Sequence, residues 1–254
     1  MAAFIDRPII LFVVLLALLI GAVAFGAFVL RRVAAVPKEE REDFNVVLAT
    51  TFTLLALLIG FSLSMAVNRY DQRKNLEENE ANAVSTEYAR ADLADAPLNA
   101  SIKAALLRYA QLRLAEYRTR DPQELDRIGR DTAVLQSELW LLATEMAKDK
   151  PTPLAAVVVT GMNDVLNAQD YSEAARINRI PVGAWVLMML IALFACTAQG
   201  YGARGRMRVG LFVTIVPVTV SLSLALIADI DSPRGGIIHV QPQNLTRLLQ
   251  SLEK

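Results

Sequence analysis

Four long apolar segments constrain this chain more than any other feature of its sequence. They cover residues 8–30, 44–67, 180–201 and 209–230, and none has Lys, Arg, Asp or Glu in its central stretch. A helix needs roughly 20 apolar residues to cross about 30 Å of hydrocarbon, and a charge at its centre costs about 2.5–3.5 kcal/mol. A helix in the core of a soluble protein is rarely apolar on all sides over this length. The sequence therefore predicts an all-α, polytopic membrane protein with four transmembrane helices.

The four segments form two hairpins and divide the chain into regions of different composition. The first apolar run is longer than the 7–15 apolar residues typical of a signal peptide, so we expect an uncleaved span. The predicted regions are a first transmembrane hairpin (1–67), an extramembrane helical domain (68–179), a second transmembrane hairpin (180–230) and a C-terminal tail (231–254).

The region between the hairpins has helical patterns throughout. Neither Gly nor Pro separates Gly60 from Pro97, so the second span is expected to continue beyond the membrane as one long helix. Apolar residues at helical spacing predict further helices over residues 99–118, 124–148 and 151–177. Because each helix has one apolar face, we expect these helices to pack into a bundle.

The distribution of Lys and Arg predicts the orientation of the spans. Short cytoplasmic loops are enriched in these residues. The two hairpin loops contain Arg31, Arg32, Lys38, Arg41, Arg204, Arg206 and Arg208. This places both loops in the cytoplasm, and the helical domain and both termini on the outer side of the membrane, which is the periplasm if the membrane is a bacterial inner membrane, as the resemblance described below implies. A second basic set flanks the membrane on the domain side and removes the asymmetry when it is counted, so the opposite orientation stays open: Arg69, Arg73, Lys74, Arg176 and Arg179.

The sequence gives little support for catalysis. The formal net charge is zero, which is not the basic signature of a nucleic-acid partner. His239 is the only histidine and Cys196 the only cysteine, so this chain alone has no multi-histidine metal site and no intrachain disulfide. The phosphate-loop, CxxC and GxSxG patterns do not occur. We expect no enzyme, no cofactor and no metal site.

Two acidic clusters have a simple structural interpretation. Glu77, Glu78 and Glu80 follow the second span, and Asp164 and Asp170 lie near two asparagines. Carboxylates can bind a divalent cation. We interpret both clusters as solvated helix faces.

A stripe of small and hydroxyl-bearing residues follows one side of the second apolar segment at steps of three or four. It can line a water-filled path, in which hydroxyl groups replace part of the hydration of an ion. The alternative is helix–helix packing, because Gly, Ser and Thr allow close approach. The predicted pore-lining residues are Thr50, Thr53, Leu57, Gly60, Ser64, Asn68 and Asp71.

The first segment carries two pairs of small residues spaced four apart. Ala17 pairs with Gly21, and Ala22 pairs with Gly26. Such pairs predict surfaces at which helices pack closely.

The fourth segment ends in an unusual acidic corner. Asp229 and Asp231 precede Pro233 and Arg234, and two glycines follow. This sequence continues a helix poorly and suits a tight turn, in which Arg234 can pair with either carboxylate. A structural salt-linked turn and a charged vestibule both fit the pattern.

Three segments in combination match a known family. They are Gly60-Phe61-Ser62-Leu63-Ser64-Met65-Ala66-Val67-Asn68-Arg69-Tyr70-Asp71, the stretch from Glu80 through Tyr88 to Asp92, and Ile227-Ala228-Asp229-Ile230-Asp231-Ser232-Pro233-Arg234-Gly235-Gly236. Trp140 and Asn163-Asp164 fit the region between them. With these segments the chain resembles the bacterial bestrophin-like membrane proteins, long catalogued as a domain of unknown function, over nearly its whole length.

The resemblance implies a layout and a function. Bestrophins have two spans, a cytoplasmic helical domain and two further spans, and form a pentamer whose second helices line an anion pore. The implied partners are the lipid bilayer, further copies of the chain and an inorganic ion. The sequence departs from bestrophins in two respects. The second span has no aromatic-rich neck, since only Phe52 and Phe61 occur there, and the C-terminal tail has no acidic segment like the calcium clasp of bestrophins. The ion selectivity is therefore unassigned.

Two functions of different classes fit these observations. The first is a homo-oligomeric ion channel or pore with the second span lining the path. The alternative is a membrane-anchored sensor or scaffold that acts through its helical domain. A transporter has less support, because no interrupted helix pair or buried charge marks a binding site at the midplane.

Overall fold

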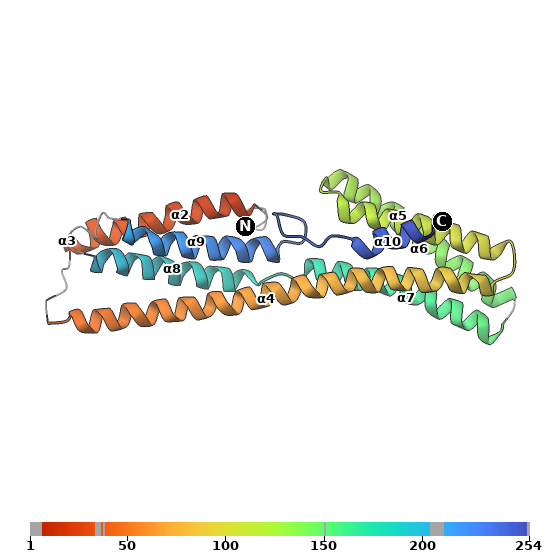
Figure 1. Ribbon diagram of the computed structural model, residues 1–254, viewed down its shortest axis with the longest axis horizontal. Helices are drawn as coiled ribbons and strands as arrows, with labels where there is room; N and C mark the ends of the chain where they lie inside the picture. Colours follow the sequence, from red (N-terminus) through yellow and green to blue (C-terminus); the bar gives the residue numbers. More distant parts are fainter. Residues whose placement is uncertain (1–6, 34–36, 38, 150, 204–210, 253–254) are drawn as a thin grey trace. The chain divides into compact units, whose positions relative to one another are not determined.

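The computed structural model describes residues 7–33, 37, 39–149, 151–203 and 211–252, and its regular elements are all helical across this part of the chain. Lys38, Arg204, Arg206, Arg208 and the start of the last predicted span lie outside the described residues. The elements are α2 (Pro8–Phe25), the π-helix η1 (Gly26–Leu30), α3 (Arg31–Val33), α4 (Arg41–Arg90), the 3-10 helix η2 (Ala91–Leu93), α5 (Leu98–Arg118), α6 (Pro122–Asp149), α7 (Pro153–Ile177), α8 (Val182–Gly202), α9 (Phe212–Asp231) and α10 (Gln243–Leu252) (Figure 1).

Four stretches of helix are long and apolar enough to cross a membrane. They include α2, α4, α8 and α9, which match the four apolar segments of the sequence. The all-α fold class with four candidate spans is confirmed. The chain forms two compact units: unit 1 comprises residues 1–70 and 179–239, and unit 2 comprises residues 71–178 and 240–254. Helix α4 contributes to both.

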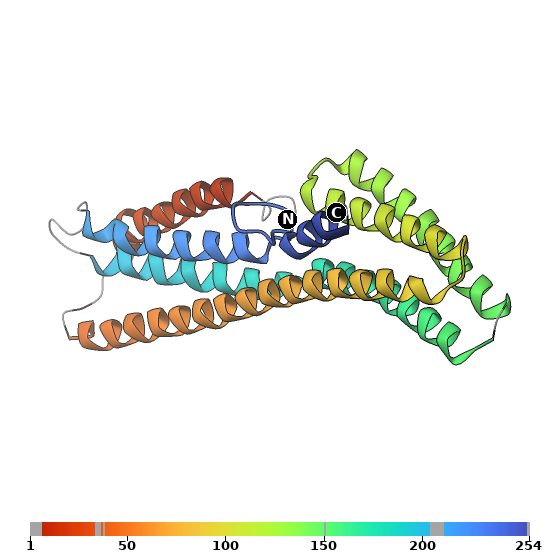
Figure 2. The ribbon, with the colours of Figure 1, turned by 45° about the vertical axis from the view of Figure 1, so that its right-hand side comes forward.

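In unit 1, α2 packs against α8 and α9 (Figures 1 and 2). Its buried residues follow each other at steps of four and form one continuous stripe, while most of the surrounding apolar side chains stay exposed. This distribution suits a helix in lipid, where association depends on close packing rather than on removing apolar surface from water. The buried stripe of α2 consists of Leu11, Leu15, Leu19 and Val23.

Two glycines, one on η1 and one on α8, allow the backbones of α2 and η1 to approach that of α8. A Cβ atom on Gly26 would overlap the carbonyl oxygen of Thr197, and one on Gly200 would overlap that of Val23. The predicted packing role of Gly26 is therefore confirmed. Gly21 differs, because a Cβ atom at this position would meet nothing within 4 Å among the described residues.

We expect Gly26→Ala to lower the free energy of unfolding by about 1–3 kcal/mol, because the new methyl group meets main-chain atoms that cannot rotate away. Gly21→Ala is the matched control on α2, where the new methyl group meets nothing in the described structure and the loss of a mid-helix glycine should leave the stability unchanged or raise it by up to about 1 kcal/mol. Thermal unfolding of the purified protein in detergent, followed by circular dichroism, measures both. Equal stabilities of the two variants would contradict the close approach.

Unit 2 contains the three further helices that the sequence predicted. α5, α6 and α7 begin and end within two residues of the predicted bounds. Thr152 caps α7 by accepting a hydrogen bond from the amide of Ala155 at 3.2 Å, and Pro153 occupies the first turn. The predicted continuation of the second span is also confirmed, since α4 runs unbroken to Arg90. The core of the unit includes Val84, Ile102, Leu106, Tyr109, Leu139, Val158, Met162, Val165 and Leu245.

The interpretation of Glu77, Glu78 and Glu80 as a solvated helix face is wrong for two of them. Glu78 is exposed, but Glu77 is 1% exposed and Glu80 is fully buried. The Glu77 carboxylate accepts hydrogen bonds from the amides of Asn244 and Leu245, both at 3.0 Å, and so caps the N-terminus of α10. A carboxylate at this end of a helix is favoured by the free N–H groups and the helix dipole. No group of three or more potential metal ligands occurs in the described part of the chain.

Candidate pore face and acidic corner

All seven predicted pore-lining residues are exposed within the chain. Six belong to unit 1 and Asp71 begins unit 2. A Cβ atom built on Gly60 would meet no other atom within 4 Å among the described residues. No helix in the described part of the same chain covers this face, so any helix that packs there belongs to another chain. The stripe is formed by Thr50, Thr53, Leu57, Gly60, Ser64, Asn68 and Asp71.

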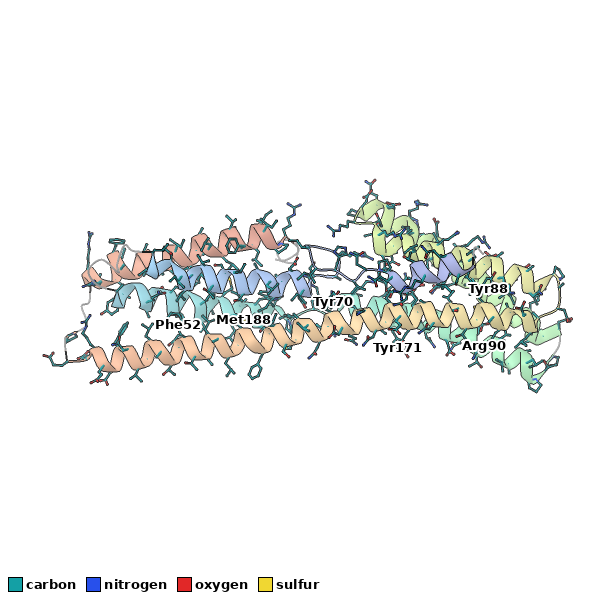
Figure 3. The ribbon with its side chains drawn as sticks, viewed as in Figure 1. Phe52, Tyr70, Tyr88, Arg90, Tyr171 and Met188 are labelled. Atoms are coloured by element: carbon teal, nitrogen blue, oxygen red, sulfur yellow. The ribbon has the colours of Figure 1, made fainter. Side chains whose placement is uncertain are left out.

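The opposite side of α4 faces the core of unit 1. Leu55, Ser62 and Ala66 are buried there, at 1%, 8% and 0% exposure. Residues two positions apart in a helix differ by about 200° in direction, so Ser62 and Ser64 point to opposite sides. The Ser62 hydroxyl donates a hydrogen bond to the sulfur of Met188 on α8 at 3.1 Å, and Phe52 also lies between α4 and α8 (Figure 3).

Helix α4 is the least covered of the candidate spans. Only 11% of the residues in its apolar window are buried within the chain, against 56% for α9. Part of its free surface is apolar and suited to lipid, including Leu54, Phe61 and Met65. The hydroxyl stripe borders this apolar surface directly, since Phe61 and Asn68 are seven residues apart on the helix and point to nearly the same side.

The threonines of the stripe have a fixed hydrogen-bond polarity. The hydroxyl of Thr50 donates to the carbonyl oxygen of Val46 at 2.8 Å, and that of Thr53 donates to Ala49 at 2.9 Å. Since each proton is directed to the helix backbone, the oxygen lone pairs face outward. These groups can accept hydrogen bonds from water or contact a partly dehydrated cation.

Asp229 holds the corner after α9 in place. Its carboxylate, 6% exposed, accepts hydrogen bonds from the amides of Ile237 at 2.7 Å and Ile238 at 3.1 Å. Gly236 has φ = 73°, and any Cβ atom there would overlap the same carboxylate. A glycine meets both requirements, because it adopts the left-handed region without cost and leaves room for the acid.

Asp231 connects three parts of unit 1. Its carboxylate is 1% exposed and accepts hydrogen bonds from the Ile180 amide at 3.2 Å and from Arg69 at 3.3 Å. The Nε atom of Arg179 lies 3.7 Å away. Carboxylates at a helix C-terminus are unfavourable unless compensated, and these partners supply the compensation. From the sequence, Arg234 was the expected partner of the acidic corner, and the pairing of Asp231 with Arg69 and Arg179 was not expected. Pro233 and Arg234 are half-buried in the turn that follows α9.

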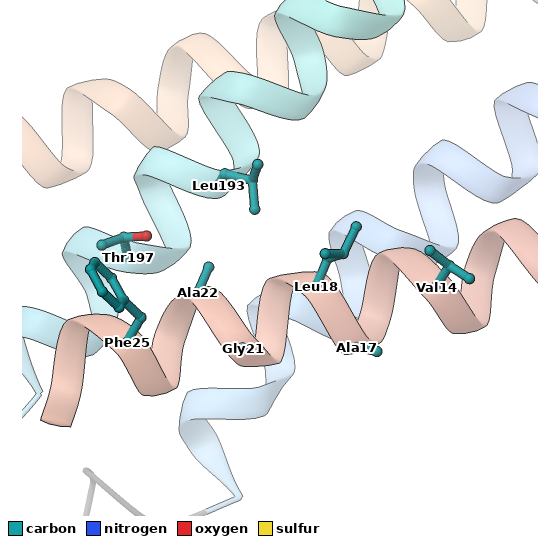
Figure 4. Close-up of a pocket in the computed structure, with 8 residues that line it drawn as sticks. All are labelled: Val14, Ala17, Leu18, Gly21, Ala22, Phe25, Leu193 and Thr197. Atoms are coloured by element: carbon teal, nitrogen blue, oxygen red, sulfur yellow. The ribbon is translucent and has the colours of Figure 1, made fainter. Parts of the chain in front are cut away.

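An apolar groove of about 610 Å³ lies between α2 and α8 (Figure 4). It contains a single hydroxyl group and no ionisable side chain, so it offers nothing to an ion. The lining residues are Val14, Ala17, Leu18, Gly21, Ala22, Phe25, Leu193 and Thr197.

Unit 2 contains a buried ion cluster that the sequence did not reveal. Arg113 is fully buried and donates hydrogen bonds to Glu80 and Glu116, and Arg176 also binds Glu116. Burial lowers the pKa of Arg113, but the charges of Glu80 and Glu116 outweigh it and raise the pKa above its usual value. The guanidinium of Arg176 lies 4.6 Å from the ring centre of Tyr117. This cluster joins α4, α5 and α7 through side chains alone.

Comparison with known proteins gives a consistent result. The sequence matches the profile of the bestrophin-like domain over residues 9–245. No curated protein sequence matches. The structure resembles a crystal structure of a bacterial bestrophin homologue from Klebsiella pneumoniae with a TM-score of 0.63 and 14% identity, covering 96% of this chain and 95% of that one. A point-substituted form of a Klebsiella homologue gives 0.66 at 14% identity, with 96% of both chains covered.

At this identity the structural likeness establishes the fold, and the sequence profile covers more than nine-tenths of the chain. The four candidate spans and the helical unit between them occupy the same order in the chain as the resemblance implied. The chain is a multi-pass membrane protein and belongs to the bestrophin-like family.

Proposed function

We propose that the protein is a homo-oligomeric ion channel in which the stripe on α4 lines the path. The observation that carries this proposal is the exposure of every stripe residue, from Thr50 to Asp71, on the side of α4 opposite its buried face. The hydroxyl protons of Thr50 and Thr53 are bound by carbonyl groups of α4 itself, but a stripe facing lipid would place the side-chain amide of Asn68 and the outward lone pairs of the hydroxyl groups in hydrocarbon, which is costly. A water-filled path shared by several copies satisfies these groups.

The path requires several subunits. Four helices of one chain are too few to enclose an aqueous channel, and three of them pack together in unit 1. Copies arranged around an axis with α4 innermost would place the hydroxyl oxygens of Thr50 and Thr53 toward the axis. The pentamer of bestrophins provides the family precedent for such a ring. The permeating species is an inorganic ion.

The first expected result is an assembled protein. Native mass spectrometry in mild detergent should give a multiple of the 27.8 kDa chain, because the uncovered face of α4 needs a partner. Five copies would match the bestrophin arrangement. A monomer that persists across several mild detergents contradicts the channel, since one chain cannot enclose the path.

The orientation of the helical domain is proposed from the charges of the hairpin loops, with the domain and both termini in the periplasm. A cysteine at the exposed Pro122, in a chain with Cys196 replaced by Ala, should then react with a membrane-impermeant thiol reagent in intact spheroplasts. A cysteine at the exposed Glu42, in the other hairpin loop, is the matched control and should react only after lysis. The reverse pattern would place the domain in the cytoplasm, as in bestrophins.

A further inference from the structure

Unit 2 contains a buried carboxyl group that is separate from the ion cluster around Arg113. Glu87 on α4 is 0% exposed, and neither carboxylate oxygen has a hydrogen-bond partner in the described structure. Leaving a buried acceptor unsatisfied is costly, and leaving it charged costs more. Glu87 therefore differs from Glu77 and Glu80, whose oxygens are bound by amides or by Arg113.

The opposing helix is shaped to accommodate this carboxyl group. Gly161 is buried in the middle of α7, and a Cβ atom on it would overlap Oε2 of Glu87 and Nη1 of Arg90. A glycine inside a helix costs about 1 kcal/mol relative to alanine. The carboxyl group thus occupies the space that a side chain on α7 would otherwise fill.

Few charges act on Glu87. On its own helix, Nη1 of Arg90 lies 3.8 Å from Oε2 of Glu87, and the Arg90 side chain is 34% exposed. On α7, the exposed Asp164 acts on it with the opposite sign. On α5, Lys103 binds Asp92 at 2.5 Å and lies 5.0 Å from the ring centre of Tyr88, one residue further along α4. Arg90 offers partial compensation only.

We propose that Glu87 is a proton-binding site at the contact of α4 with α7, and that loss of its proton loosens this contact. With the proton in place, a neutral carboxyl group fits against Gly161. Without the proton, a charge without hydrogen bonds is enclosed between two helices. The helical unit then opens more readily along α7.

The environment sets the pH at which this change takes place. Burial raises the pKa of Glu87 from 4.5 to about 7, Arg90 lowers it in part, and Asp164 raises it. Because the folded state holds the proton more tightly than the unfolded state, the contact is strongest at low pH and weakens as pH rises from about 4.5 to 7. Above about pH 7 Glu87 has lost its proton in the folded state as well, and the contact of α4 with α7 weakens no further.

Hydrogen–deuterium exchange of the full-length protein in detergent tests the proposal. After correction for the intrinsic pH dependence of exchange, protection of α7 around Gly161 should fall roughly 20-fold between pH 5.5 and 8. Glu87→Gln keeps the shape of the side chain and removes the ionisable group, so the protection of α7 in this variant should not change with pH. His239→Asn replaces the only histidine of the chain, which lies in unit 1, and as a control should behave like the wild type.

Two exposed or partly exposed residues provide a test that leaves Glu87 in place. Arg90→Gln removes a positive charge and should move the midpoint of the protection change to higher pH. Asp164→Asn removes a negative charge and should move it to lower pH. Protection of α7 that is independent of pH in the wild type, or midpoints that do not move in opposite directions, would overturn the proposal.

Discussion

Arg113→Met is expected to lower the free energy of unfolding by about 3–5 kcal/mol, the usual cost of removing one partner from a buried ion pair. Methionine fills much of the space of the arginine stem but leaves the fully buried Glu80 without its cation. Glu116 keeps Arg176 as a partner, so the main loss falls on Glu80. Thermal unfolding of the purified protein in detergent, followed by circular dichroism, measures the change.

A surface pair provides the control for this variant. Arg108 lies on α5, like Arg113, and binds Glu138 on α6, and the two side chains are 56% and 43% exposed. Arg108→Met should therefore lower the free energy of unfolding by at most about 1 kcal/mol. The double variant Arg113→Met with Glu80→Gln should recover a large part of the lost stability, because it removes the unpaired charge. Equal effects at Arg113 and Arg108 would show that the buried cluster does not hold unit 2 together.

Ser64→Trp is expected to abolish ion flux while the protein still assembles. Ser64 lies in the middle of the exposed stripe, and in a ring of subunits every copy would place an indole in the path. Packing predicts another outcome, because a large side chain between close backbones forces helices apart and the assembly would then dissociate. Flux into proteoliposomes measures the first effect, and native mass spectrometry measures the second.

Met65→Trp is the matched control, since Met65 is the next residue on α4, is 40% exposed and points about 100° away, toward the apolar side. It should leave both flux and assembly unchanged. Normal flux and normal assembly in Ser64→Trp would remove the stripe from the path. This result would favour the alternative function, a membrane-anchored sensor or scaffold that acts through its helical domain.

The membrane helices and the bundle could be predicted from the sequence because their signals are local. Uniform apolarity over some 20 residues marks a span, and apolar spacing marked α5, α6 and α7. α10 carries the same kind of signal, with Leu245, Leu248, Leu249 and Leu252 at helical spacing, and could have been recognised in the region predicted as a tail. α10 was not predicted because it is only ten residues long, and so short an apolar pattern is weak evidence for a helix.

The buried charges could not be predicted, because their partners are distant in sequence. Glu80 meets Arg113, and Glu77 meets the start of α10, across 33 and 167 residues. A run of acids after a span resembles a solvated face until the opposing helix is known. Glu87 was hidden for the same reason, since only the packing of α7 places Gly161 against it.

The sequence did not decide whether the stripe on α4 lines a water-filled path or packs against another helix. Small and hydroxyl-bearing residues suit both a pore and a packed interface, and the pattern alone left both open. The structure rules out packing of the stripe against another described helix of the same chain, because the buried face of α4 uses Leu55, Ser62 and Ala66 instead. Water, lipid and a helix of another chain are the neighbours that this exposure allows, so a pore and an interface between chains both fit it.

Recording from the purified protein in a planar bilayer tests the central claim most directly. The wild-type oligomer should produce discrete conductance steps, and replacing the main cation and then the main anion should move the reversal potential in one of the two experiments. The Ser64→Trp oligomer, at the same amount of protein, should produce none. Membranes that contain verified wild-type oligomer and conduct no more than protein-free membranes would contradict the channel.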